Sequence, residues 1–165
     1  MSWSDDSIDE RLEEADIREI FYNGISPTIE FFLSTPSKID TYSESSIPSE
    51  ADLAREACGI GNRSGGVILF GVGKSGEVKG ITDTEEGIDE IAEIFEDQIE
   101  PDLSYDLYAV EIDNKFILVS RIKKYTETDA ELPFAVQGQF FYRKSKHSYP
   151  MSPSTLKAIL ESSTQ

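Results

Sequence analysis

The segment Asn62-Arg63-Ser64-Gly65-Gly66 has the residue types of an anion-binding loop. It lies between the predicted end of a helix and a predicted buried strand over residues 67–70. Glycine permits left-handed backbone and the close approach of a ligand, and the Arg63 guanidinium can bind a phosphate or a carboxylate through two parallel hydrogen bonds. The alternative is a tight connection that needs glycine for steric reasons. The sequence leaves both interpretations open.

Two further glycine motifs resemble nucleotide-binding fingerprints but lack the context that those fingerprints need. Gly71-x-Gly73-x-x-Gly76 should be followed by a helix whose N-terminus holds a pyrophosphate, whereas Glu77–Ile81 predicts a strand. Gly73-Lys74-Ser75 matches the end of a P-loop, but the position of the first glycine of that motif is Ile68. We therefore exclude both a Rossmann site and a Walker-type site.

Cys58 and His147 are the single cysteine and the single histidine of the chain. They could form a nucleophile and base pair, but Cys58 lies in a predicted helix with no evident base nearby, which favours a small buried side chain. One Cys and one His cannot build a structural zinc site. A single cysteine also excludes an internal disulfide, which suits the reducing cytoplasm.

The net charge of -17 opposes binding to nucleic acid or to anionic membranes over most of the surface. Either a halophilic origin or ordinary acidic segments would explain such a composition. The charge is uneven, because residues 1–56 carry 14 acids and 4 bases, whereas residues 114–147 carry 7 bases and 3 acids. The bases in this second region are Lys115, Arg121, Lys123, Lys124, Arg143, Lys144 and Lys146.

Basic and aromatic residues interleave near the end of this region, as in surfaces that bind nucleic acid by backbone contact and base stacking. The predicted surface consists of Arg63, Lys74, Lys123, Lys124, Arg143 and Lys144, with the aromatic residues Tyr125, Phe140, Phe141 and Tyr142 between them. The alternative, that the aromatic residues fill the core and the lysines form a solvated face, stays open.

Hydrophobic periodicity and turn residues predict a mixed α+β fold, with a central mixed or antiparallel sheet, hairpins, and three or four flanking helices. We expect helices over 5–22, 49–58, 84–99 and 152–160. We expect strands over 29–33, 67–70, 77–81, 105–112, 115–122, 134–136 and 139–143, with hairpin turns at Asp113-Asn114 and Gln137-Gly138. No apolar run is long enough to span a bilayer, so we expect a cytoplasmic protein without a membrane partner.

The order of these pieces resembles the Schlafen-type AlbA-like domain. The resemblance covers about residues 26–161, and its pieces are Glu30-Phe31, Ala57 through Gly66, Val67–Val72, Gly80-Ile81, Pro101 and Tyr142-Arg143. It implies a Schlafen AlbA-like domain over residues 26–165, preceded by an acidic extension over 1–25. It also implies binding of nucleic acid, or of a nucleotide such as ATP.

Nuclease members of that family use three carboxylates to hold a divalent metal, which activates water on a phosphodiester. Only Glu30 remains here, because the other two positions hold Ile25 and Gly73, and the lysine position holds Phe32. We therefore expect no catalytic metal and no nuclease activity.

The leading hypothesis is a non-catalytic, regulator-like module that binds nucleic acid weakly, with no cofactor. A nucleotide site in the glycine-rich loop and a protein-interaction role for the acidic N-terminal helix are the alternatives, and a homodimer stays open.

Overall fold

The first sheet of the computed structural model, which describes residues 11–38 and 48–163, contains four strands in the order β1-β2-β5-β4. They are β1 (Ile29–Phe32), β2 (Gly66–Phe70), β4 (Tyr105–Ile112) and β5 (Lys115–Ile122). The strands β1 and β2 are parallel, and the other neighbours are antiparallel. Asp113 and Asn114 form the predicted turn between β4 and β5, with φ of 54° and 63°.

The second sheet has the order β3-β6-β7-β8 and is antiparallel throughout. Its strands are β3 (Ile99–Glu100), β6 (Ala135–Val136), β7 (Gln139–Lys144) and β8 (His147–Pro150). The predicted turn at Gln137-Gly138 is confirmed, with φ of 50° and 77°. The strand β8 was not predicted, because its turn is made by Ser145-Lys146, which is not a typical turn pair, although Ser145 adopts a φ of 55°.

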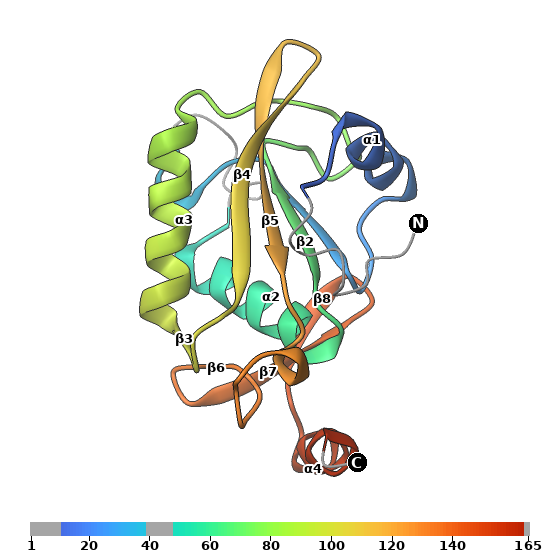
Figure 1. Ribbon diagram of the computed structural model, residues 1–165, viewed down its shortest axis with the longest axis vertical. Helices are drawn as coiled ribbons and strands as arrows, with labels where there is room; N and C mark the ends of the chain where they lie inside the picture. Colours follow the sequence, from blue (N-terminus) through green and yellow to red (C-terminus); the bar gives the residue numbers. More distant parts are fainter. Residues whose placement is uncertain (1–10, 39–47, 164–165) are drawn as a thin grey trace.

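The helices are α1 (Glu14–Asn23), α2 (Glu50–Arg63), α3 (Thr84–Gln98) and α4 (Pro153–Ser163), with short 3₁₀ turns η2 (Pro36–Lys38) and η4 (Tyr125–Glu127). Figure 1 shows α1 and α3 on opposite sides of the first sheet, with β8 and α4 far from the β4–β5 turn. The predicted mixed α+β class is confirmed. Residues 5–10 of the first predicted helix lie outside the described part of the chain.

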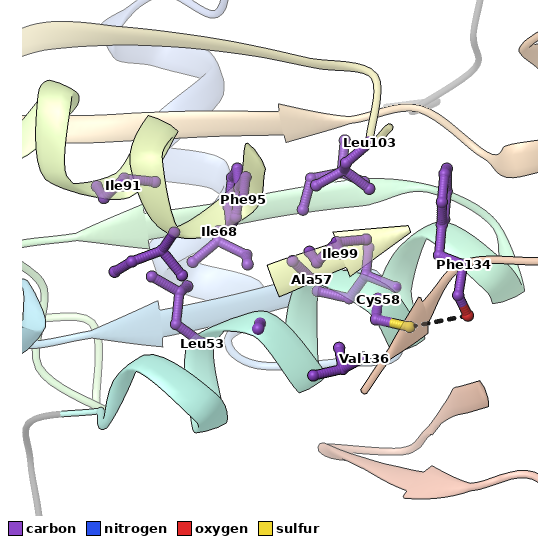
Figure 2. Close-up of a cluster of buried hydrophobic side chains, with 14 of the residues drawn as sticks. Leu53, Ala57, Cys58, Ile68, Ile91, Phe95, Ile99, Leu103, Phe134 and Val136 are labelled. Atoms are coloured by element: carbon purple, nitrogen blue, oxygen red, sulfur yellow. Dashed lines mark hydrogen bonds between the residues drawn. The ribbon is translucent and has the colours of Figure 1, made fainter. Parts of the chain in front are cut away.

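The two faces of the first sheet pack into two separate cores, because side chains alternate along each strand. Ile68 and Phe70 of β2 belong to the core under α2 and α3, and Val67 and Leu69 belong to the other. Figure 2 shows the first core, with Leu53, Ala57 and Cys58 of α2 facing residues of β2 and α3. Helix α1 covers the second core through Ile17 and Ile20, which are buried.

Helix α2 is longer than predicted and runs through Gly59 and Gly61 to Arg63. The predicted helix over 49–58 ends just before these glycines, because glycine often follows the last residue of a helix. Their positions show another reason for glycine: a Cβ on Gly59 would run into Ser148 of β8, and one on Gly61 would lie 2.8 Å from the ring of Phe134. The two glycines therefore let α2 approach the second sheet closely, which places Arg63 beside β7.

The predicted strand over 77–81 is wrong. The segment forms only an isolated bridge between Val72 and Val78, and the amides of Lys79 and Gly80 both bond to the carbonyl of Gly71. The loop folds back on itself because Gly71, Gly76 and Gly80 all adopt positive φ. In the described ranges, no helix is long and apolar enough to cross a bilayer.

Candidate nucleic-acid interface

Arg143 is buried and bound to protein groups, so it cannot serve as the surface contact that the sequence suggested. Its side chain is 0% exposed. Nη1 donates to Glu30 Oε2 at 3.1 Å and to Glu56 Oε1 at 2.8 Å. The other two guanidinium nitrogens donate to the carbonyls of Ser26 and Ile29 at 3.0–3.3 Å. All three guanidinium nitrogens therefore donate hydrogen bonds to groups of β1, α2 or the segment before β1. These bonds hold β7 against β1 and α2, and the buried guanidinium is not accessible to a phosphate.

Asn62 is also a buried structural residue. Its amide nitrogen donates to the carbonyls of Phe134 at 2.9 Å and Phe141 at 2.7 Å, and its Oδ1 accepts from the Phe134 amide at 2.7 Å. These bonds fasten α2 to the segment around β6 and to β7. Because a buried amide without partners would be costly, this pattern explains why asparagine stands here, and it removes Asn62 from the ligand-binding set.

The glycines of the loop satisfy steric demands. Gly65 has a φ of 77°, and a Cβ there would lie 2.7 Å from the carbonyl oxygen of Ile122 and 2.9 Å from the amide of Lys124. A Cβ on Gly66 would run into the carbonyl of Thr28. Ser64 donates its hydroxyl to the carbonyl of Gly65 at 3.0 Å. The loop therefore packs backbone against backbone, as the steric interpretation of the segment expected.

Arg63 reaches the strand β7 from the end of α2. Its Nη1 donates to the carbonyl of Arg143 at 2.9 Å, and its guanidinium carbon lies 5.8 Å from the centre of the Tyr142 ring. That hydrogen bond uses one of the five N–H donors of the guanidinium. Arg63 is half-buried, so it keeps donors that a phosphate on the neighbouring surface could reach.

Lys123 and Lys124 lie between the end of β5 and the start of η4. Lys123 lines a cavity of about 700 Å³ together with the acidic residues Asp102, Glu127 and Asp129. These carboxylates make the surroundings of Lys123 negative, which opposes phosphate binding there. Lys124 precedes η4, and its amide lies close to Gly65. We therefore leave Lys123 out of the candidate interface.

The outward side of the β7–β8 hairpin carries the aromatic and basic residues that the interface needs. Because Phe141 and Arg143 point inward and are buried, their neighbours Tyr142 and Lys144 point outward. Their partners across the ladder are Tyr149 and His147. Tyr149 is 48% exposed, and its ring centre lies 6.4 Å from that of His147. We call Tyr142, Lys144, His147 and Tyr149 the hairpin face.

The sequence carries a signal for this face that the charge balance of residues 114–147 reflects only in part. Residues 132–160 contain no Asp or Glu, although the chain has 32 acidic residues. The same stretch holds Arg143, Lys144, Lys146, Lys157 and His147. The net charge of residues 114–147 does not show this contrast, because that range includes Glu127, Asp129 and Glu131. The positive surface therefore centres on β7, β8 and the turn between them.

A cavity of about 450 Å³ lies beside the hairpin face, at the turn between β7 and β8. Its walls include Glu30, Lys74, Lys146 and His147. The Lys74 ammonium, whose side chain is 50% exposed, donates to the Phe31 carbonyl at 2.7 Å and to Glu30 Oε1 at 3.2 Å. The same ammonium lies 4.7 Å from the centre of the Phe32 ring. Lys74 thus combines a structural ion pair with an exposed position in the cavity.

The residues of this cavity do not fit the divalent metal that the nuclease members of the family hold. Ile25 lines the cavity with Glu30 but offers no oxygen ligand. A side chain at Gly73 would run into the carboxylate of Glu77. Both oxygens of Glu30 already accept bonds from Lys74, Arg143 and the Phe31 amide. Across residues 11–38 and 48–163, no three His, Cys, Asp or Glu side chains gather closely enough to hold a metal.

Cys58 is separate from this surface and does not pair with His147. Its thiol is buried and donates to the carbonyl of Phe134 at 3.1 Å, as Figure 2 shows. Burial raises the pKa of Cys58 to about 12, so the thiol stays protonated and unreactive at neutral pH. His147 is exposed on β8. The interpretation of Cys58 as a small buried side chain agrees with this placement.

Comparison with solved structures finds chains that resemble this one in fold. The N-terminal domain of an ATP-dependent DNA helicase RecG-related protein from Nitrosomonas europaea aligns with a TM-score of 0.52 and 16% identity. That alignment covers 81% of this chain and 89% of the other. A protein from Corynebacterium diphtheriae aligns with a TM-score of 0.49 and 16% identity, over 76% of this chain but only 25% of the other. No curated protein matches the sequence.

The family assignment rests on the sequence itself. The family model described as Schlafen, AlbA_2 matches residues 26–152. This match includes the strand with Glu30, the loop from Asn62 to Gly66, and the complete hairpin of β7 and β8. The chain belongs to the Schlafen AlbA_2 family.

Proposed function

We propose that this chain is a non-catalytic nucleic-acid-binding domain that contacts its ligand through the hairpin face. The observation that carries the proposal is the hairpin face itself, a basic and aromatic surface in a stretch without acidic residues, on a protein with a net charge of -17. Membership of the Schlafen AlbA_2 family and the fold shared with a DNA helicase RecG-related protein support the same assignment.

The chemistry of the hairpin face suits a single strand. Tyr142 and Tyr149 are paired across the two strands and offer ring surface for stacked bases. Lys144 on the hairpin face and Arg63 at its border supply positive charge for the phosphates. None of these contacts reads a base edge, so the binding is expected to depend little on sequence. A regulator-like role, in which the domain recruits nucleic acid for a partner, fits such a surface.

The test is a titration of a fluorescently labelled single-stranded oligonucleotide with the wild-type protein and with a Lys144→Ala/Tyr149→Ala variant. Wild type should bind in the micromolar range, and the variant should bind about tenfold or more weakly, because each stacked base contributes about 1–3 kcal/mol. Lys115→Ala is the matched control, since it removes one exposed charge at the β4–β5 turn, far from β8 (Figure 1).

Equal affinity of wild type and the double variant would contradict the hairpin face as the binding site. No binding by wild type at any salt concentration would contradict the whole proposal and favour a protein-interaction role. The same mixtures, supplied with magnesium or manganese, test the non-catalytic part. The oligonucleotide should stay intact, and cleavage that Glu30→Gln abolishes would show a working nuclease site.

A further inference from the structure

The cavity beside the β7–β8 turn has the size and the position of a ligand site. Its volume of about 450 Å³ lies within the roughly 300–1,000 Å³ of small-molecule pockets. Its walls come from four parts of the chain, namely the end of α1, the strand β1, the Lys74 turn and the β7–β8 turn. It adjoins the hairpin face directly, because His147 belongs to both.

The charges around the cavity leave a positive surplus. Glu30 is 3% exposed. Glu30 and Glu56 carry two negative charges, and the two positive charges of Lys74 and Arg143, which form ion pairs with them, balance these. Lys146 is exposed and forms no ion pair with any carboxylate of the described segments. Lys146 and His147 therefore present donors to the cavity that form no ion pair with a carboxylate of residues 11–38 or 48–163, and Lys74, which is paired with Glu30, adds a third exposed donor group.

The end of α1 provides an aromatic ring to the cavity. Tyr22, at the end of α1, is 90% exposed and belongs to neither hydrophobic core. Asn23 beside it offers an amide with two donors and one acceptor. The end of α1 thus contributes an exposed ring and an amide, and the Lys74 and β7–β8 turns contribute amine and imidazole groups. These groups match the two parts of a nucleotide, namely the flat base and the phosphate.

We propose that this cavity binds a nucleoside that carries a terminal phosphate monoester. The phosphate contacts Lys146, His147 and Lys74, and the base stacks on Tyr22. A monoester carries up to two negative charges, whereas each internal phosphodiester carries one, so the ammonium groups of Lys146 and Lys74 favour the terminal group. This inference rests on the proposed function, since a strand on the hairpin face would place its phosphorylated end in the cavity.

The experiment compares one oligonucleotide with a 5′-phosphate and the same oligonucleotide with a 5′-hydroxyl, each titrated with wild type. The phosphorylated strand should bind about fivefold to tenfold more tightly, which is the effect of one additional ordinary hydrogen bond. Lys146→Ala and Tyr22→Ala should remove this preference, and Tyr22→Ala, which leaves the hairpin face intact, should keep the affinity for the hydroxyl strand within about twofold. Lys115→Ala should keep the preference.

A third arm with adenosine monophosphate separates a strand end from a free nucleotide. Competition by the monophosphate, but not by adenosine, means that the cavity also takes the free nucleotide. Equal binding of the two strands by wild type, with no binding of the monophosphate, overturns the inference while the proposed function stands. If neither strand binds, the proposed function fails. In that case, monophosphate binding that Lys146→Ala abolishes would still support a phosphate site in the cavity. If the monophosphate does not bind either, the inference is overturned together with the proposed function.

Discussion

Arg143 and Lys144 are adjacent basic residues on β7, yet they have opposite roles because side chains alternate along a strand. Arg143 points inward to two carboxylates and two carbonyls, whereas Lys144 points outward on the hairpin face. The residue types alone did not separate these roles. What distinguishes the two residues is the ion pairs of Arg143 with Glu30 and Glu56. These carboxylates are distant in sequence and come close to Arg143 only in the folded chain.

The burial of Arg143 leads to a prediction about stability. Arg143→Ala would leave Glu30 and Glu56 without their shared partner, and breaking a buried ion pair from one side typically costs about 3–5 kcal/mol. Lys144→Ala, the exposed neighbour, should change the free energy of unfolding by less than about 0.5 kcal/mol. Urea unfolding of both variants checks this. If Arg143→Ala unfolds like wild type and loses oligonucleotide binding instead, Arg143 is a ligand contact after all.

At the scale of elements, periodicity predicted most helices and strands, because most of them have one buried face. The hairpins at Asp113-Asn114 and Gln137-Gly138 followed from their turn residues. The strand β8 and the full length of α2 could not be predicted, since they depend on contact between Gly59 and Ser148, which are far apart in sequence. Arg63 and Lys144 of the candidate interface were predicted, but their grouping with Tyr149 needed β8.

The loop between α2 and β2 gives a prediction that separates backbone strain from steric contact. Gly65 and Gly138 both have a φ of 77°, but only Gly65 would place a Cβ against backbone atoms of another segment. Gly138→Ala should therefore cost about 1 kcal/mol from conformation alone, and Gly65→Ala should cost clearly more. Thermal unfolding measures both. Equal losses for the two variants would mean that the contacts with Ile122 and Lys124 relax freely.

At the scale of the whole molecule, the acidic field limits how tightly the hairpin face can bind a polyanion. The surplus of acidic residues lies outside residues 132–160, in segments that include α1 and α3. Acidic residues at a distance repel the strand, while Lys144, Lys146 and Arg63 attract it locally. Salt weakens both effects, since the screening length is about 10 Å at 0.1 M.

The balance of these two effects predicts an unusually shallow salt dependence. Three phosphate contacts on a single strand alone would give a slope of about -2 for log K against log salt, from about -0.7 per contact. Because salt also screens the repulsion, the measured slope should be shallower than about -2. Neutralising the exposed α3 residues in an Asp89→Asn/Glu93→Gln/Asp97→Asn variant should raise the affinity at low salt and steepen the slope. Titrations between about 0.05 and 0.3 M salt measure both proteins. A wild-type slope steeper than about -2, or an identical slope for the variant, would show that the acidic surface does not govern binding.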